Sequence, residues 1–128
     1  MMFPAVVPLL GFVRAIAVEA NGQLVVVDSN LDAVLRVDPL TGNRTIVSDA
    51  ATGGGTAFVN PTNIAVEADG QLVVVDDALA TIFRGDPSTG NRTIISNFET
   101  GNGPIMLGAR DLVVEANGRL VVLDASPA

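Results

Sequence analysis

One stretch of thirteen residues occurs three times in this sequence, at a constant spacing of 48 residues. The copies are IAVEANGQLVVVD at 16–28, IAVEADGQLVVVD at 64–76 and LVVEANGRLVVLD at 112–124. The identity extends beyond the stretch, since residues 16–45 and 64–93 agree at 21 of 30 positions. A strong repeat of this length indicates one supersecondary unit used several times. The 128 residues hold two complete units and the beginning of a third.

Turn residues divide each unit into four short pieces. The first piece ends at Asn21-Gly22, or at Asp69-Gly70 in the second copy. Such dipeptides favour a two-residue hairpin turn in which both central residues have positive φ. Later, DPLTGNRT and DPSTGNRT supply an Asp acceptor, a Pro with preset φ and a Gly for the left-handed position of another turn. No apolar stripe with helical spacing persists, so the sequence predicts only strands, near 16–19, 23–28, 33–38, 43–48, 64–67, 71–76, 81–86, 91–96, 112–115 and 119–124.

The second piece of each complete unit, QLVVVD, is apolar without alternation. This pattern is typical of a strand that is covered on both faces. The fourth piece begins with polar Asn, Arg and Thr, as an outer strand would. Apolar inner strands and a wetter outer strand suit the blades of a β-propeller, which pack face to face around an axis. The predicted fold is all-β, with β-propeller blades of four antiparallel strands, a period of 48 residues and about two and a half blades per chain.

In this reading the chain is a single partial propeller. We expect blade 1 at about 14–49, blade 2 at about 62–97 and an incomplete blade 3 at about 110–125. Residues 3–10 contain the apolar run Ala5-Val6-Val7 and could complete the third blade of a partner chain.

These features resemble NHL-repeat propellers and, more distantly, gluconolactonase-like propellers with six blades. The resemblance is carried by NPTNIAVEADGQLVVVD at 60–76, by the glycine-rich TGGGTAFV before it, and by GNGPIMLGARDLVVEANGRLVVLD at 101–124. It covers nearly the whole chain beyond residue 10 and implies a fold more than an activity. The tryptophan–aspartate type of propeller repeat is excluded because the chain has no Trp.

Positions just before the first predicted strand differ among the copies. They read Arg14-Ala15, Thr62-Asn63 and Arg110-Asp111. In lactonase-like propellers, acidic and amide residues near the inner strands hold a metal at the mouth of the channel. The resemblance therefore makes Asn63 and Asp111 candidate ligands, with calcium as the candidate ion, while solvated turn residues are the alternative. We expect no catalytic residue and no bound cofactor, and the related amidating lyases use His ligands that this chain lacks.

Several charged residues repeat with the unit. Asp28, Asp76 and Asp124 end the second strand of every copy and could form a ring of carboxylates for a cation. Their symmetry favours the other interpretation, in which each carboxylate accepts hydrogen bonds from turn amides, because a functional site usually breaks the symmetry of a repeat. Arginines also repeat, and we expect them to pair with Asp and Glu across strands or between blades: Arg36, Arg44, Arg84 and Arg92.

One loop has part of a calcium-binding pattern. Asp28, Asn30 and Asp32 have the spacing of the first three ligands of a calcium loop. Ala33 and Pro39 stand where such a loop needs Gly and Glu, so we expect no calcium site there.

The residue types that are missing narrow the chemistry further. Without His, Cys or Lys the chain lacks the commonest general base, a thiolate and a Schiff-base amine. The net charge of −7 argues against nucleic acid and against anionic membranes as partners. The N-terminal segment MMFPAVVPLLGFVRAIA lacks a basic region before its apolar run and does not make a convincing signal peptide. Localisation stays unknown, with the cytoplasm favoured.

The number of units leaves the propeller open. Closed propellers have typically four to eight blades, and an open arc exposes the apolar faces of its end blades. We therefore expect self-association, with a homodimer of about six blades favoured and a trimer second, unless the chain is a fragment of a longer propeller. The favoured function is a non-catalytic scaffold for a peptide or protein ligand. The alternatives are a metal-dependent lactonase of the gluconolactonase-like type and a truncated propeller without selected activity.

Overall fold

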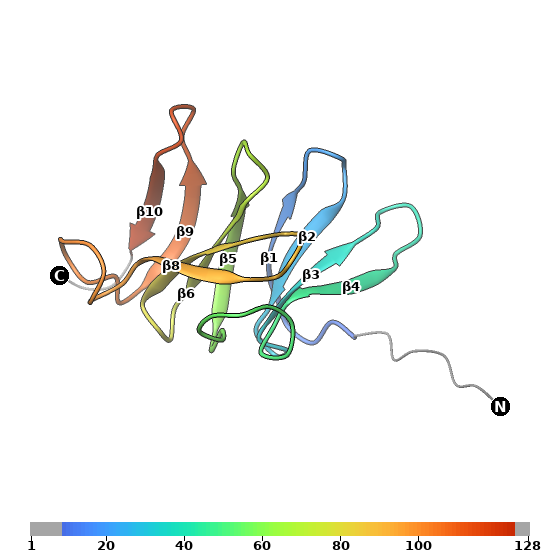
Figure 1. Cartoon of the computed structure of the whole chain (residues 1–128), viewed down its shortest axis with the longest axis horizontal. Coiled ribbons are helices and arrows are strands. Elements are labelled where there is room, and N and C mark those ends of the chain that lie inside the picture. The colour runs from blue at the N-terminus through green and yellow to red at the C-terminus, as the bar shows by residue number, and fades with distance from the viewer. Residues whose placement is uncertain (1–8, 125–128) are drawn as a thin grey trace.

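The computed structural model describes residues 9–124 and arranges them as short strands joined by turns (Figure 1). No helix occurs within that range, which confirms the predicted all-β fold. The ten strands are β1 (Val13–Val18), β2 (Leu24–Asp28), β3 (Ala33–Val37), β4 (Arg44–Ser48), β5 (Pro61–Val66), β6 (Leu72–Asp76), β7 (Thr81–Gly85), β8 (Arg92–Ser96), β9 (Ala109–Val114) and β10 (Leu120–Asp124).

The strands form three antiparallel sheets in chain order. Two sheets have four strands, β1-β2-β3-β4 and β5-β6-β7-β8, and the third contains β9 and β10. The first strands of the three sheets, β1, β5 and β9, are neighbours, so the sheets fan out from them (Figure 1). This is the arrangement of propeller blades around an axis, seen over part of a turn. Residues 3–8, which were predicted to contribute to a partner's third blade, lie outside the described range.

The first strand of each sheet begins three residues earlier than predicted. In β5 the ladder passes from Asn63↔Val75 to Pro61↔Asp76 across a β-bulge, and β1 and β9 contain the same irregularity. A bulge places two residues opposite one and bends the strand. The prediction began these strands only after the bulge, at residues 16, 64 and 112.

The hairpin turns differ from the predicted type. Glu19 N donates to Gln23 O at 2.8 Å and Gly22 N donates to Glu19 O at 2.9 Å, which closes a three-residue loop. Gly22 has φ of 88°, but the only described non-glycine residues with positive φ lie elsewhere in the chain. The two-residue prediction was therefore wrong for Asn21, whose Oδ1 instead accepts from Gln23 N at 3.0 Å. Type I turns followed by a left-handed glycine are the common form of three-residue hairpin loops.

The second strands of the two complete sheets, β2 and β6, are buried along nearly all of their length, as predicted. Val73 and Val75 of β6 face the third sheet, and Leu72 and Val74 face the first sheet, all essentially without exposure. The largest apolar cluster joins the first two sheets and includes Phe58 and Phe83, whose rings meet edge to face at 5.2 Å. In β10 exposure alternates along the strand instead, because no described sheet covers its outer face.

Paired arginines hold the outer strands in place. Arg36 of β3 donates to both carboxylate oxygens of Glu19 at 2.5 and 2.9 Å, and Arg84 of β7 binds Glu67 at 2.6 and 2.8 Å. Such two-point pairs combine charge with a fixed geometry. The expectation of carboxylate partners is confirmed for these two arginines.

Arg92 of β8 departs from that expectation, because its acceptors belong to the segment that connects the first two sheets. Arg92 is 5% exposed, and its guanidinium lies over the Phe58 ring, 5.3 Å from the centroid. Burial lowers the pKa of this group, against an opposing contribution from the charge of Asp49. The acceptors, at 2.7 to 3.2 Å, are Ser48 Oγ and the carbonyl oxygens of Asp49, Thr52, Gly55 and Thr56.

Replacing the turn glycine Gly70 by Val should destabilise the fold by roughly 1–3 kcal/mol, because a β-branched residue is strained at positive φ. Gly70 has φ of 91°, and a Cβ added to it would meet nothing within 4 Å. The loss of stability would therefore come from backbone strain and not from a steric clash of the Cβ. The measurement is the free energy of unfolding in urea, with Ala68→Val in the same turn as the matched control. Equal stability of Gly70→Val and the parent would contradict the left-handed assignment.

Arg92→Met should destabilise the chain by about 3 kcal/mol or more. The substitution keeps a long side chain but leaves several carbonyl groups of the connecting segment without their charged donor. The equivalent substitution in the first unit, Arg44→Met, is the control and should cost less, because the Arg44 hydrogen bond to Gly42 O is long, at 3.3 Å, and exposed. Thermal unfolding of both variants measures the difference, and equal melting temperatures would show that the connecting segment holds its shape unaided.

Candidate functional site

The two candidate ligands predicted from the sequence meet in the structure. Asn63 Nδ2 donates to Asp111 Oδ1 at 2.8 Å, which joins the neighbouring strands β5 and β9. Each side chain also accepts from the backbone amide of the next residue at 2.8 Å, through Asn63 Oδ1 and Asp111 Oδ1. The pair lies at the bulges of these first strands, inside the strands rather than before them. A bulge redirects a side chain, which is how both residues reach the same point.

This pair provides few donors for a metal ion. Ala15 occupies the equivalent position in β1 and offers no oxygen side chain. Among the described residues, no group of three or more Asp and Glu side chains lies close enough to hold a cation. A hard cation such as calcium takes six to eight oxygen ligands. The described residues therefore supply at most a fraction of a calcium shell at this point.

The repeated aspartates at the ends of the second strands are turn acceptors in this structure. The Asp28 carboxylate is fully buried and accepts four backbone amides at 2.6 to 3.1 Å, those of Gly11, Phe12, Asn30 and Leu31. Asp76 accepts three amides at equivalent positions and Asp124 accepts the amide of Gly108. Burial opposes ionisation of Asp28, but the amides outweigh it and hold its pKa below the usual value. The amides also occupy this carboxylate, which argues against a cation at Asp28.

Asp32 is a residue whose environment the sequence did not reveal. Its Oδ1 atom is buried without a hydrogen-bond partner. Burial raises the pKa of Asp32, and the nearby charges of Asp76 and Asp28 raise it further. The residue also has a positive φ of 50°, like Ala80 at the equivalent position of the second unit. The only sequence signal was this difference between copies, Asp in one and Ala in the other.

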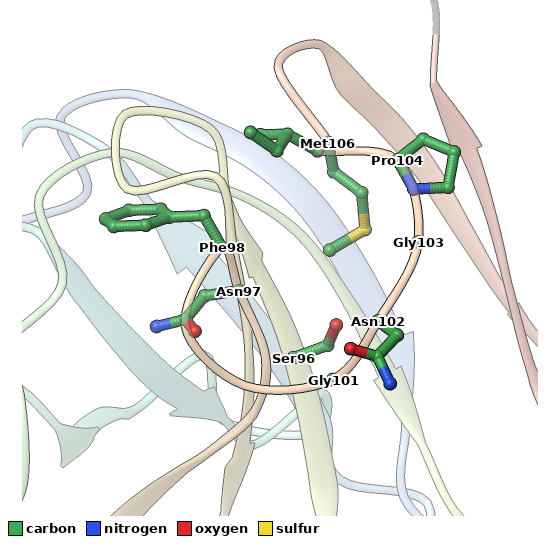
Figure 2. Close-up of a pocket in the computed structure, with 9 residues that line it drawn as sticks. Ser96, Asn97, Phe98, Gly101, Asn102, Gly103, Pro104 and Met106 are labelled. Carbon is green, nitrogen blue, oxygen red and sulfur yellow. The ribbon is translucent and has the colours of Figure 1, made fainter.

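A pocket opens beside the connection between the second and third sheets (Figure 2). It is formed by the segment 96–106, which follows β8 and leads toward β9. Its lining includes Ser96, Asn97 and Phe98 from one side of the loop and Gly103 and Met106 from the other. No feature of the sequence marked this segment as a site.

Comparisons of the whole chain with known proteins support the fold. The structure is similar to a gluconolactonase from Xanthomonas campestris, with a TM-score of 0.72 and 21% identity over 92% of this chain and 36% of that one. It is also similar to virginiamycin B lyase from Staphylococcus aureus, with a TM-score of 0.66 and 15% identity over 88% of this chain and 34% of that one. For a PQQ-bound aldose sugar dehydrogenase from Streptomyces coelicolor the TM-score is 0.59, with 17% identity over 89% of this chain and 37% of that one.

These likenesses and the four-stranded antiparallel sheets define the chain as having a β-propeller fold. The chain spans about a third of the length of these structures. No protein-family model matches the sequence, and no curated protein matches it either. Within the described residues, no helix is long and apolar enough to cross a membrane.

Asp32→Asn should stabilise the fold at pH 7 by about 1 kcal/mol, because a charged carboxylate whose buried Oδ1 has no hydrogen-bond partner is costly. The pKa of Asp32 is raised in the folded state, so its protonated form favours folding at low pH and that benefit is lost as the pH rises through the folded pKa. The gain from Asn should therefore shrink toward pH 3. Urea unfolding at several pH values measures it, and Asp69→Asn in an exposed turn is the control. A pH-independent difference would contradict the assignment.

Proposed function

We propose that this chain is a non-catalytic propeller module, of NHL-repeat-like character, that acts as an interaction scaffold and closes its ring by self-association. The observation that carries the proposal is the exposure of apolar side chains on the two outermost sheet faces. On the first sheet the exposure is confined to β1, where Ile16 and Val18 are 59% and 62% exposed, whereas Val26 and Leu35 on the same face are buried. On the third sheet, Val113, Val121 and Leu123 are exposed, whereas the equivalent positions of the other two sheets are mostly buried. Exposed apolar side chains gathered on one face favour an interaction site there.

The two exposed faces have complementary counterparts inside the chain. The interface between the first and second sheets packs Val25 and Val27 against Ile64 and Val74. Through the repeat of 48 residues, Val121 and Leu123 of the third sheet correspond to Val25 and Val27. Ile16 and Val26 of the first sheet correspond to Ile64 and Val74. A second copy could therefore pack its first sheet on the third sheet of this one through contacts of the same kind. Repeated head-to-tail contacts of this type close a ring when the rotation fits.

We expect a homodimer of about six blades, with a trimer as the second outcome, and a peptide or protein ligand on one face of the ring. The acidic net charge and the missing residue types support the absence of nucleic-acid binding and of catalysis.

The chain should not be a stable monomer at micromolar concentration. A monomer would leave the apolar side chains of its two outermost sheet faces in water, and burying apolar surface stabilises by roughly 25 cal/mol per Å². Light scattering coupled to size exclusion measures the mass. Val121→Asp should dissociate or aggregate the assembly, because it places a charge in the face between copies. The control is Leu40→Asp, which changes a 94% exposed leucine in a turn and should leave the mass unchanged. A monodisperse, cooperatively folded monomer of the parent would contradict the proposal.

A metal-dependent lactonase is the second candidate, and the Asn63–Asp111 pair is the observation that favours it. The similarity to a gluconolactonase adds to it only at the level of the fold. In a ring of two chains, the partner's copy of the pair could supply further oxygen ligands. Calcium that binds only the folded ring would raise its melting temperature, and Asp111→Ala would abolish that shift. If calcium does not raise the melting temperature of a ring whose mass has been confirmed, the lactonase candidate is excluded and the scaffold function is retained.

A further inference from the structure

The outer edge of β10 is unpaired within the described part of the chain. In the complete sheets, the equivalent strands β2 and β6 each pair on that side with an outer hairpin, β3–β4 or β7–β8. Strand β10 pairs only with β9. An open strand edge presents unpaired amide and carbonyl groups and can accept an added strand. The complete sheets show which hairpin such an edge is shaped to receive.

Glu115 is the first contact point that such a hairpin would use. It occupies the position at which Glu19 and Glu67 bind an arginine of the third strand at two points. Glu115 is exposed, and none of the arginines whose side chains are described pairs with it. It also lines a groove together with Glu67 and Asp69, between the tips of two hairpins, so the local charge is negative. In the second sheet Arg84 lies opposite Val73, so an arginine opposite Val121 would reach Glu115.

The pocket of residues 96–106 is the second contact point (Figure 2). It is the repeat equivalent of the segment 48–58 that surrounds the Arg92 guanidinium. The turn in it is already formed, since Thr100 N donates to Asn97 Oδ1 at 2.7 Å just as Thr52 N donates to Asp49 Oδ1 at 2.7 Å. The pocket therefore has the backbone shape of the Arg92 binding segment without an arginine in it.

Glycines in the two segments show that the space beside the pocket is open. A Cβ on Gly53 or Gly55 would lie 2.0 or 2.3 Å from backbone oxygens of the β7–β8 hairpin. The equivalent Gly103 has nothing within 4 Å, and Gly101 has only Ser96 Oγ at 3.6 Å. The room that the outer hairpin takes in the second sheet is thus vacant beside the third sheet.

We propose that the edge of β10 binds a β-hairpin that carries two arginines eight residues apart, one on Glu115 and one in the pocket of residues 96–106. Both outer hairpins of this chain have that pattern, as RVDPLTGNR at 36–44 and RGDPSTGNR at 84–92. The ladder aligns the hairpin antiparallel to β10, and the turn between Gly85 and Arg92 sets the distance between the two arginines. The partner is therefore a protein segment with the motif Arg-x-Asp-Pro-x-Thr-Gly-Asn-Arg. This inference does not depend on the ring-closing function, which uses the sheet faces.

The probe is a synthetic peptide with the sequence of residues 79–97, LATIFRGDPSTGNRTIISN, labelled at one end for fluorescence anisotropy. The peptide should bind the full chain, and replacing both of its arginines by Gln should weaken binding about tenfold or more, since each loses charge-assisted hydrogen bonds. On the protein, Glu115→Gln should weaken the parent peptide about tenfold. Asp38→Asn, which removes the same charge from a turn of the first sheet and keeps an Oδ1 acceptor for Leu40 N, is the control and should have little effect.

A double-mutant cycle assigns each arginine to its acceptor. The loss from Glu115→Gln should vanish with the Arg84→Gln peptide and persist with the Arg92→Gln peptide. Ser96→Ala, which removes the hydroxyl equivalent to Ser48 Oγ, should couple to Arg92→Gln instead. Circular dichroism and unchanged melting temperatures establish that the variants are folded.

Three results would overturn the proposal. They are no binding of the parent peptide, equal binding of the double-Gln peptide, and a self-associated form that excludes the peptide whether or not Glu115 is replaced. The last result would mean that a second copy covers the edge through apolar contact. A change of mass with Val121→Asp but not with Glu115→Gln would keep the ring-closing function separate from this outcome.

Discussion

The structure depends on one packing constraint: a strand whose successive side chains are all apolar needs a neighbour on each face. Strand β6 meets the constraint completely, with Val73 and Val75 against the third sheet and Leu72 and Val74 against the first. Because the units repeat, every sheet carries the same two apolar faces, and the first and last sheets each have one face left over. Interiors are packed as densely as organic crystals, so such faces are stable only when a partner of matching shape covers them.

Polar contacts then fix how one sheet sits on the next. The buried Asp76 carboxylate accepts hydrogen bonds from backbone amides of the segment before β5 and of the turn after β6. These bonds fix the position of the chain where it enters β5. Arg92 binds the segment that arrives from the previous sheet, and Gly90 O accepts from Ser48 Oγ at 2.7 Å in the same place. Buried donors and acceptors are costly unless paired, so these contacts specify one relative position of the sheets where apolar packing alone would allow several.

The repeat and its turn residues were enough to predict the fold class, the number of strands and the two-sided burial of β6. They were not enough for features that depend on three-dimensional context. The loop at Asn21-Gly22 has three residues because the Asn21 side chain binds the backbone of Gln23, which competes with the tighter turn. The role of Arg92 was missed because its acceptors are carbonyl groups, which carry no sequence signature. The sequence showed that the residues at the positions of Asn63 and Asp111 differ among the copies. It could not show that the two side chains meet, because that contact depends on the β-bulges.

The two kinds of open surface on this chain should respond differently to salt. The sheet faces around Ile16 and Val121 are apolar, and burial of apolar surface is strengthened by excluded salts such as sulfate. The β10 edge relies on Glu115 and on carbonyl groups that receive a guanidinium, and exposed charge pairs are screened over about 8 Å at physiological ionic strength. Closure of the faces and capture of an arginine hairpin are therefore separable by ionic strength.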